Sequence, residues 1–167
     1  MSASPEILLL AMRSLPHGPE FRFVDRLLSL VPGKKAVAEY RVRGDEYYLR
    51  GHMPGEPLFP GVLLVEAVAQ VAGVVAQNDP DYPAFAGLKL TALRAVKILG
   101  TARPGETVLL EAALTGRLGH LVQAKGTASV AGVKMLSAEL TLSGTPKPAG
   151  GQTPAQGIEE SDDGSAA

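Results

Sequence analysis

Residues 51–70 read GHMPGEPLFPGVLLVEAVAQ, and this stretch decides the fold. Its first half is a loop made stiff by proline and glycine. Its second half opens an apolar run that continues to Ala76. Pro60 suits the first position of a helix, where its missing N–H group leaves no bond unmade. We therefore expect a helix over residues 60–77, and because that helix is apolar on every side, we expect it to be buried.

Segments on both sides of this helix resemble β-strands. Residues 21–42 hold two apolar runs separated by PGKK, which predicts a hairpin, and a short helix capped by Ser2 or Ser4 precedes them. Three or four further strands follow the long helix, in FAGLKLTALRAVKIL, TVLLEAALTGRL, HLVQAKGTASVA and VKMLSAELTLS. One buried helix with five or six antiparallel strands predicts an α+β fold, in which a sheet curls around the helix.

The chain of 167 residues, 46% of them apolar, is long enough for one domain with a real core. Composition changes after Ser143, where glycine, proline, alanine and acidic residues replace large aliphatic ones. Such a segment buries too little surface to offset the entropy of ordering it. We therefore expect a folded domain over residues 1–143 and a disordered tail over 144–167.

Several classes of function are disfavoured by composition. The chain has no cysteine, which excludes disulfides, thiolate metal sites and cysteine nucleophiles. His17, His52 and His120 are far apart without the spacing of metal ligands, so we expect no metal. A net charge of −1 gives no basic field for nucleic acid. No apolar run is long enough to span a membrane and no signal peptide is evident, so we expect a cytoplasmic protein.

Two polar side chains lie within the apolar helix. Glu66 and Gln70 are four residues apart and therefore share one face. Burying an unpaired carboxylate costs several kcal/mol, or the group takes up a proton instead. One interpretation is structural, with Glu66 satisfied by hydrogen bonds to the backbone or to Gln70. The other is functional, because a desolvated carboxylic acid can donate a proton near neutral pH.

His52 favours the functional interpretation, although a lone histidine in a loop is more often a surface residue. It stands in a loop whose prolines and glycines fix the path of the chain into the helix. The N–H groups of Gly61 and Val62 then point outward at the positive end of the helix dipole, where they can stabilise an oxyanion. A base, an acid and an oxyanion donor suffice to abstract a proton α to a carbonyl and expel a β-hydroxyl group.

The stretch resembles the hallmark GHFPGxPxMPGVLxxEAxAQ of the FabZ-type β-hydroxyacyl-acyl-carrier-protein dehydratases of bacterial fatty-acid synthesis. LPHGPEFRFVDRLLSLVPGKKAVAEYRV is similar to that family's opening block, and FAGLKLTALRAVKILGTARPGE is similar to a third block. The resemblance covers residues 12–143. It implies a hotdog fold, a curved antiparallel sheet wrapped around one long helix. The related FabA type carries Asp at the position of Glu66.

The resemblance also implies a mechanism without metal or redox cofactor. His52 would take the proton α to the thioester carbonyl, and Glu66 of the other subunit of a homodimer would protonate the departing hydroxyl. The N–H of Gly61 would hold the thioester oxygen. An acyl tunnel near the dimer interface would be lined by Leu58, Phe59, Val62 and Phe85. The substrate would be carried by acyl carrier protein or coenzyme A, and the dimers of this family often form trimers of dimers.

The chain departs from the family pattern at several positions. Met53 and Phe59 exchange the usual Phe and Met, which keeps apolar bulk and implies an altered tunnel shape. The opening loop after His17 differs, and the segment 88–103 is longer. The family meets its acidic carrier protein with basic residues near that segment, a role open here to Arg94, Lys97 and Arg103. We expect His17 and His120 to be non-catalytic.

Two other functions remain open. A hotdog thioesterase would hydrolyse the thioester, but it needs a carboxylate placed to activate water. A non-catalytic hotdog domain would hold acyl chains or carrier proteins without turnover. The presence of both His52 and Glu66 favours the dehydratase over this binding protein.

Overall fold

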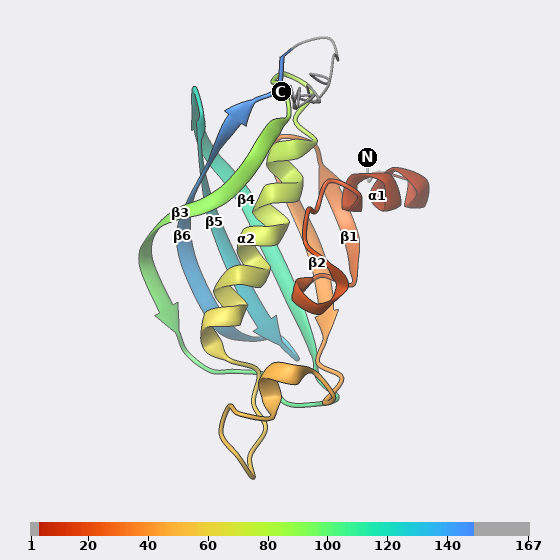
Figure 1. Cartoon of the computed structure of the whole chain (residues 1–167), viewed down its shortest axis with the longest axis vertical. Helices are drawn as coiled ribbons and strands as arrows, with labels where there is room; N and C mark the ends of the chain where they lie inside the picture. Colours follow the sequence, from red (N-terminus) through yellow and green to blue (C-terminus); the bar gives the residue numbers. More distant parts are fainter. Residues whose placement is uncertain (1–3, 149–167) are drawn as a thin grey trace, which may run out of the picture.

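A computed structural model describes residues 4–148 of the chain. A long helix, α2 (Gly61–Gln77), lies against one face of a six-stranded antiparallel sheet in the order β1-β2-β4-β5-β6-β3 (Figure 1). The strands are β1 (Arg26–Val31), β2 (Lys35–Arg41), β3 (Phe85–Ile98), β4 (Thr107–Leu118), β5 (Leu121–Val130) and β6 (Val133–Pro146). The short helices are α1 (Pro5–Met12), η1 (Pro19–Phe21) and η2 (Tyr47–Leu49). The predicted α+β hotdog fold is confirmed.

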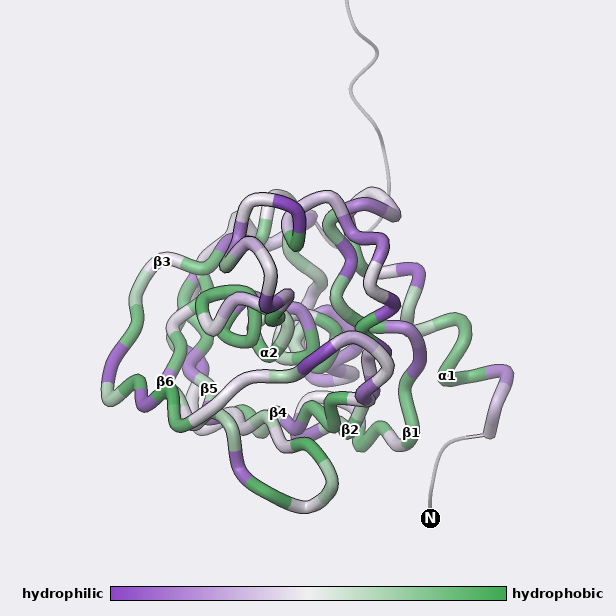
Figure 2. The backbone as a smooth tube through the Cα atoms, turned by 90° about the horizontal axis from the view of Figure 1, so that it is seen from below, coloured by the Kyte–Doolittle hydropathy of each residue, from purple (hydrophilic) through white to green (hydrophobic). Residues whose placement is uncertain are grey.

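The sheet curves around α2. Seen along the helix, the strands follow one another in an arc from β3 through β6, β5, β4 and β2 to β1 (Figure 2). Small residues let the two layers approach closely, because a Cβ atom placed on Gly126 would clash with Cγ1 of Val68. Nearly every residue of α2 from Leu64 to Ala76 is buried, as its apolar sequence predicted. Val62 at its start is the exception, with 68% of its surface exposed.

The ends of the elements agree with the sequence in most places. Ser4 caps α1 by accepting a hydrogen bond from the N–H of Ile7. Pro60 is the N-cap of α2 rather than its first residue, so the helix begins at Gly61. β6 continues to Pro146, past the predicted end of the domain at residue 143. Most of the predicted tail, residues 149–167, lies outside the described residues, as does Ser2.

β3 is an edge strand that runs antiparallel to α2, with Phe85 at its beginning bonded to Gln77 and Ile98 at its end beside Gly61. Three register irregularities interrupt its pairing with β6, and Ala95 at one of them has φ 50°. Such bulges bend a strand locally and interrupt its ladder of hydrogen bonds. From Ala86 onward, nearly every residue of β3 is exposed to solvent. Within residues 4–148, no helix is both long and apolar enough to cross a membrane.

Candidate active site

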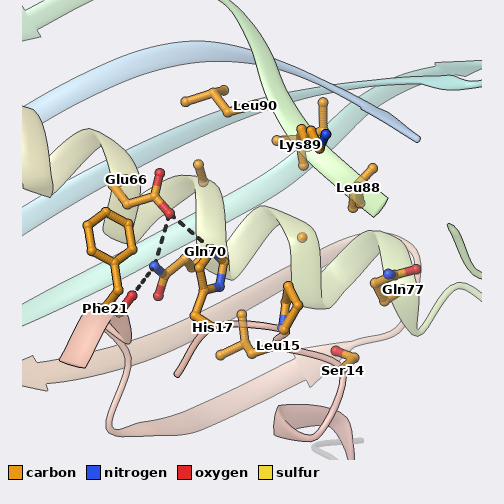
Figure 3. Close-up of a pocket in the computed structure, with 14 residues that line it drawn as sticks. Ser14, Leu15, His17, Phe21, Glu66, Gln70, Gln77, Leu88, Lys89 and Leu90 are labelled. Atoms are coloured by element: carbon orange, nitrogen blue, oxygen red, sulfur yellow. Dashed lines mark hydrogen bonds and ion pairs between the residues drawn. The ribbon is translucent and has the colours of Figure 1, made fainter. Parts of the chain in front are cut away.

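Glu66 lies on the face of α2 that looks toward the N-terminal segment of the chain (Figure 3). Its Oε1 atom accepts a hydrogen bond of 3.0 Å from Nε2 of Gln70. Nε2 of His17 lies 3.3 Å from the same oxygen. No group among residues 4–148 donates a hydrogen bond to Oε2. The carboxylate is therefore held through one oxygen and leaves the other for a ligand.

Gln70 fixes the orientation of this carboxylate. It is 2% exposed, and its Oε1 accepts a 2.9 Å hydrogen bond from the N–H of Phe23. Its Nε2 donates to the carbonyl of Phe21 at 2.8 Å as well as to Glu66. Because the backbone N–H needs an acceptor and the carbonyl needs a donor, only one orientation of the amide satisfies both. The pairing of Glu66 with Gln70 that the structural interpretation required does form.

His52 lies in the loop between η2 and α2 and is half-buried. Its Nδ1 is 3.0 Å from the carbonyl oxygen of Leu58. A carbonyl only accepts hydrogen bonds, so Nδ1 carries the proton and Nε2 of the neutral ring is a free base. Met53, the next residue, has φ 55°, a left-handed conformation that is costly for a residue with a side chain.

The loop that carries His52 is anchored at its downstream end by Phe59. The N–H of Phe59 donates to the carbonyl of Ala102 at 2.8 Å, and the hydroxyl of Thr101 donates to the carbonyl of Phe59. The ring of Phe59 is wholly buried and packs edge-on against Phe23. The end of the loop is thus tied to the chain that follows β3.

Its upstream end is anchored by a tyrosine pair. The hydroxyl of Tyr40 on β2 lies 3.0 Å from that of Tyr48 and donates to Glu46 at 3.0 Å. Burial raises the pKa of Tyr40 to about 12, so this hydroxyl stays protonated at neutral pH. Both rings pack against Phe59, so the two anchors share one aromatic cluster. The path of the loop is therefore fixed by buried contacts rather than by proline and glycine alone.

Gly61 begins α2, and its N–H donates to no backbone acceptor within the described chain. A Cβ atom at this position would lie 2.8 Å from Cγ2 of Ile98, the last residue of β3. Only glycine therefore lets the helix start approach the end of that strand. The free N–H at the helix N-terminus can hold a negatively charged oxygen.

The structure does not join His52 to Glu66 within one chain. Neither a hydrogen bond nor an ion pair connects them in residues 4–148, and Glu66 contacts His17 instead. His17 was predicted to be non-catalytic, and that stays a prediction, but its contact with Glu66 was not foreseen. No local pattern indicates this contact, because 49 positions separate the two residues and two strands lie between them. His120 lies in an exposed turn between β4 and β5.

A cavity of about 330 Å³ opens beside Glu66. Its floor is the face of α2 that carries Ala69 and Gly73, and its roof is the beginning of β3 and part of β6 (Figure 3). The remaining wall is the segment Ser14–His17 with Phe21. The small residues three and seven positions after Glu66 are the sequence signal that could have located this space.

None of the predicted tunnel residues lines this cavity. Phe59 is 0% and Phe85 is 1% exposed, because both rings fill the core. Leu58 is half-buried and its carbonyl contacts Nδ1 of His52, and Val62 is exposed in the single chain. The acyl tunnel was predicted near a dimer interface, so its lining by these four residues stays a prediction.

Of the three basic residues predicted to meet a carrier protein, Arg94 and Lys97 lie on β3 and Arg103 lies in the segment that follows it. Arg94 on β3 pairs with Glu139 at 2.9 Å, and Arg103 pairs with Glu56 at 2.7 Å. Lys97 forms no salt bridge with any described residue.

No cluster of three or more His, Asp or Glu side chains suited to a metal occurs in residues 4–148.

The chain is similar to known proteins in sequence and fold. A family model described as FabA-like domain matches residues 15–139. A 3-hydroxyacyl-[acyl-carrier-protein] dehydratase FabZ of Thermoanaerobacter sp. (strain X514) is 39% identical over 126 residues, 75% of this chain and 88% of that protein. The FabZ of Symbiobacterium thermophilum is 36% identical over 148 residues, 83% of this chain and 99% of that protein.

Solved structures resemble the chain in fold alone. The dehydratase heterocomplex ApeI:P from Xenorhabdus doucetiae matches with a TM-score of 0.68 at 18% identity, over 82% of this chain and 91% of that one. A hypothetical thioesterase from Streptococcus pneumoniae TIGR4 matches with a TM-score of 0.56 at 11% identity, over 74% of this chain and 87% of that one. One fold thus occurs in proteins whose names differ in reaction, so the site must decide the function.

Proposed function

The chain belongs to the FabA-like domain family, and we propose that it dehydrates 3-hydroxyacyl thioesters to trans-2-enoyl thioesters in fatty-acid biosynthesis. It is then a hydro-lyase. The observation that carries this proposal is a carboxylic acid held through one oxygen beside a cavity, in a chain that also presents a free histidine base. Acyl carrier protein is the proposed carrier, and the cytoplasm the proposed location.

Each chemical step has a group to perform it. Nε2 of His52 takes the proton from the carbon α to the thioester carbonyl, because Nδ1 is already bonded to Leu58. The negative charge that develops on the thioester oxygen faces the N–H of Gly61. The β-hydroxyl group leaves with a proton from Glu66, so that one C–H bond and one C–O bond break and water departs. The new double bond takes up the electron pair of the C–H bond.

The hydrogen bonds to Glu66 determine which oxygen carries the proton. Oε1 accepts from Gln70 and faces Nε2 of His17, so it has no room for a proton of its own. The acidic proton therefore resides on Oε2. This arrangement supports a role for His17 in positioning Glu66, since His17 keeps Oε1 occupied. Among the described residues, His17 Nδ1 is buried without a hydrogen-bond partner, so the contact of Nε2 with Glu66 is the polar contact of this ring.

We propose that the active unit is a homodimer paired through β3. This strand is 14 residues long, and its outer edge pairs with no other described strand. Natural proteins rarely leave such an edge free, because unpaired N–H and C=O groups invite another strand. Exposed apolar side chains accompany the edge, among them Leu93 at 49%, Ile98 at 48% and Leu99 at 62%. A second copy would cover all of them.

Antiparallel pairing of two β3 strands would also complete the site. A two-fold axis near the middle of β3 places the end of one strand beside the beginning of the other. Ile98 at the end of β3 lies beside Gly61, so the loop that carries His52 lies near that end of the strand. Leu88 and Leu90 near the beginning roof the cavity beside Glu66. The dimer therefore brings His52 of one subunit toward Glu66 of the other.

Mixing two inactive variants tests this arrangement. His52→Ala and Glu66→Gln should each abolish interconversion of 3-hydroxyacyl and enoyl thioesters, followed by absorbance. After the two variants are unfolded together and refolded, half of the dimers are hybrids, and each hybrid has one intact site. About a quarter of the wild-type turnover should return. If no turnover returns, the site does not use His52 and Glu66 from different subunits.

The same assay with the wild-type protein distinguishes a dehydratase from a thioesterase and from a non-catalytic binding domain. Release of a free carrier thiol without enoyl product would identify a thioesterase. Binding of acyl thioesters without turnover would identify a non-catalytic domain. Either result would refute the proposal that the protein is a dehydratase.

A further inference from the structure

The cavity beside Glu66 has a closed far end. It runs along one face of α2, which Glu66, Ala69, Gly73 and Gln77 line in succession, and Glu66 and Gln77 lie at opposite ends of the view (Figure 3). These residues recur at three- or four-position intervals, so they form one stripe along the helix. A linear acyl chain whose reacting carbon lies at Glu66 would follow this stripe toward Gln77.

Gln77 forms the end wall through a two-bond clamp. Its Nε2 donates to the carbonyl of Phe85 at 3.0 Å, and its Oε1 accepts from the N–H of Phe85 at 2.7 Å. Phe85 is the first residue of β3 and is 1% exposed. The guanidinium of Arg117 lies 4.3 Å from the centre of the Phe85 ring and pairs with Asp79, both side chains being less than a tenth exposed. The amide of Gln77 is therefore hydrogen-bonded to both backbone groups of Phe85, and it presents a polar surface where an alkyl chain would meet it.

The middle of the cavity is kept open by a missing side chain. A Cβ atom on Gly73 would meet only Cδ2 of Leu88, at 3.9 Å. Glycine in the middle of a helix lowers stability relative to alanine, and here no close approach requires it. The absence of a side chain at Gly73 thus leaves space rather than avoids a clash.

Length and volume each set an upper limit, and the volume is the tighter one. Eleven positions separate Glu66 from Gln77, about 16 Å at a helical rise of 1.5 Å per residue. Carbon–carbon bonds of about 1.5 Å advance about 1.25 Å each in a zigzag chain, so this distance takes about 13 carbons beyond the β-carbon, or an acyl chain of about 16. A cavity of 150 Å³ holds the six carbons of benzene, and about 330 Å³ would then hold about 13. The side chain of Gln77 shortens the usable path slightly.

We propose that Gln77 and Gly73 set the acyl-chain length that this protein accepts, with Gln77 as an end wall that restricts it to groups of about 12 carbons or fewer. The proposal rests on the proposed function, because it takes the cavity beside Glu66 as the acyl site. It assigns specificity to two residues outside the reacting groups. Longer chains must break the clamp to Phe85 or leave methylene groups in water.

The test measures kcat/KM for 3-hydroxyacyl thioesters of four, eight, twelve and sixteen carbons. The wild type should fall by about tenfold or more between twelve and sixteen carbons. Gln77→Ala removes the wall and should recover much of the sixteen-carbon turnover relative to the eight-carbon turnover. Gly73→Leu fills the middle of the cavity, about 10 Å from Glu66, and should move the fall to between about eight and twelve carbons. Gln123→Ala, on the exposed face of β5, is the matched control and should keep the wild-type profile.

The outcomes separate this proposal from the proposed function. A wild type that turns over four-carbon substrate but shows no fall up to sixteen carbons overturns the end wall and leaves the dehydratase intact. Failure with every chain length overturns the dehydratase itself. If Gln77→Ala does not fold, as judged by thermal unfolding, the profile of Gly73→Leu still decides. An unchanged Gly73→Leu profile means that the acyl chain lies elsewhere.

Discussion

Replacing Gln70 with methionine tests the buried network beneath the site. Methionine has nearly the same length but makes no hydrogen bonds of comparable strength. The N–H of Phe23 then loses the acceptor 2.9 Å away, and this residue is 1% exposed, so water cannot replace it. The carbonyl of Phe21 loses a donor, but Phe21 is 41% exposed and its backbone can meet water.

The expected loss of stability follows from the loss of these two hydrogen bonds. An orphaned buried donor costs about 1–3 kcal/mol, and a hydrogen bond exchanged for water costs about 1 kcal/mol. Gln70→Met should therefore lower the free energy of unfolding by about 2–4 kcal/mol and the melting temperature by about 5–10 °C. Because Glu66 also loses its 3.0 Å donor, kcat should fall by about tenfold with little change in KM.

Urea unfolding at one fixed protein concentration measures the first effect, since dimers become more stable with concentration. The midpoint should drop while the slope m stays constant. Gln123→Met on the exposed face of the sheet is the control, and it should change stability by less than about 0.5 kcal/mol. Equal stability of Gln70→Met and the wild type would refute the reasoning, because it would mean that the amide satisfies no buried group.

Three further perturbations have defined outcomes. Gly61→Ala should lower kcat, because its Cβ atom would lie 2.8 Å from Ile98, and adding Ile98→Ala should restore turnover in a double-mutant cycle. His17→Asn should lower kcat by about tenfold with little change in melting temperature, since it removes the 3.3 Å contact to Glu66 and the packing of a part-exposed ring near Phe21, whereas a marked loss of stability would indicate a structural role. Burial acts to raise the pKa of Glu46, but hydrogen bonds from backbone N–H groups outweigh it and lower that pKa. Its contribution to stability is therefore present above 4.5 and lost as the pH falls toward the lowered value, so Glu46→Gln should flatten acid unfolding below pH 4.5.

Features that depend on neighbouring residues could be predicted from the sequence, whereas features that depend on contacts between distant segments could not. The long helix was predictable because its signal is local: a proline at the start, then an unbroken apolar run. The hairpin at PGKK was predictable because Gly33 has φ 67° there, a conformation that glycine adopts without strain. The pairing of Glu66 with Gln70 followed from their four-residue spacing on one helix face.

Other features depended on where distant segments meet. The tunnel near the dimer interface stays a prediction, but burial of the Phe59 and Phe85 rings in the core of one chain could not be predicted from their apolar character alone. The contact of His17 with Glu66 requires the segment before η1 to lie across α2, which no local pattern encodes. The strand β3 was predicted, but its three bulges arise only in register with β6.

The sequence by itself determined the family, the curved sheet around one helix, and the two residues proposed to carry the chemistry. Each of these is written in patterns of neighbouring residues, namely apolar periodicity, turn residues and the spacing of His52 from Glu66. Only the tertiary structure decided that Glu66 is held through one oxygen, and that the open space runs from Glu66 along α2 to Gln77. Cavities and hydrogen-bond networks depend on side chains brought together from distant positions, and packing fixes their positions only when the whole chain has folded.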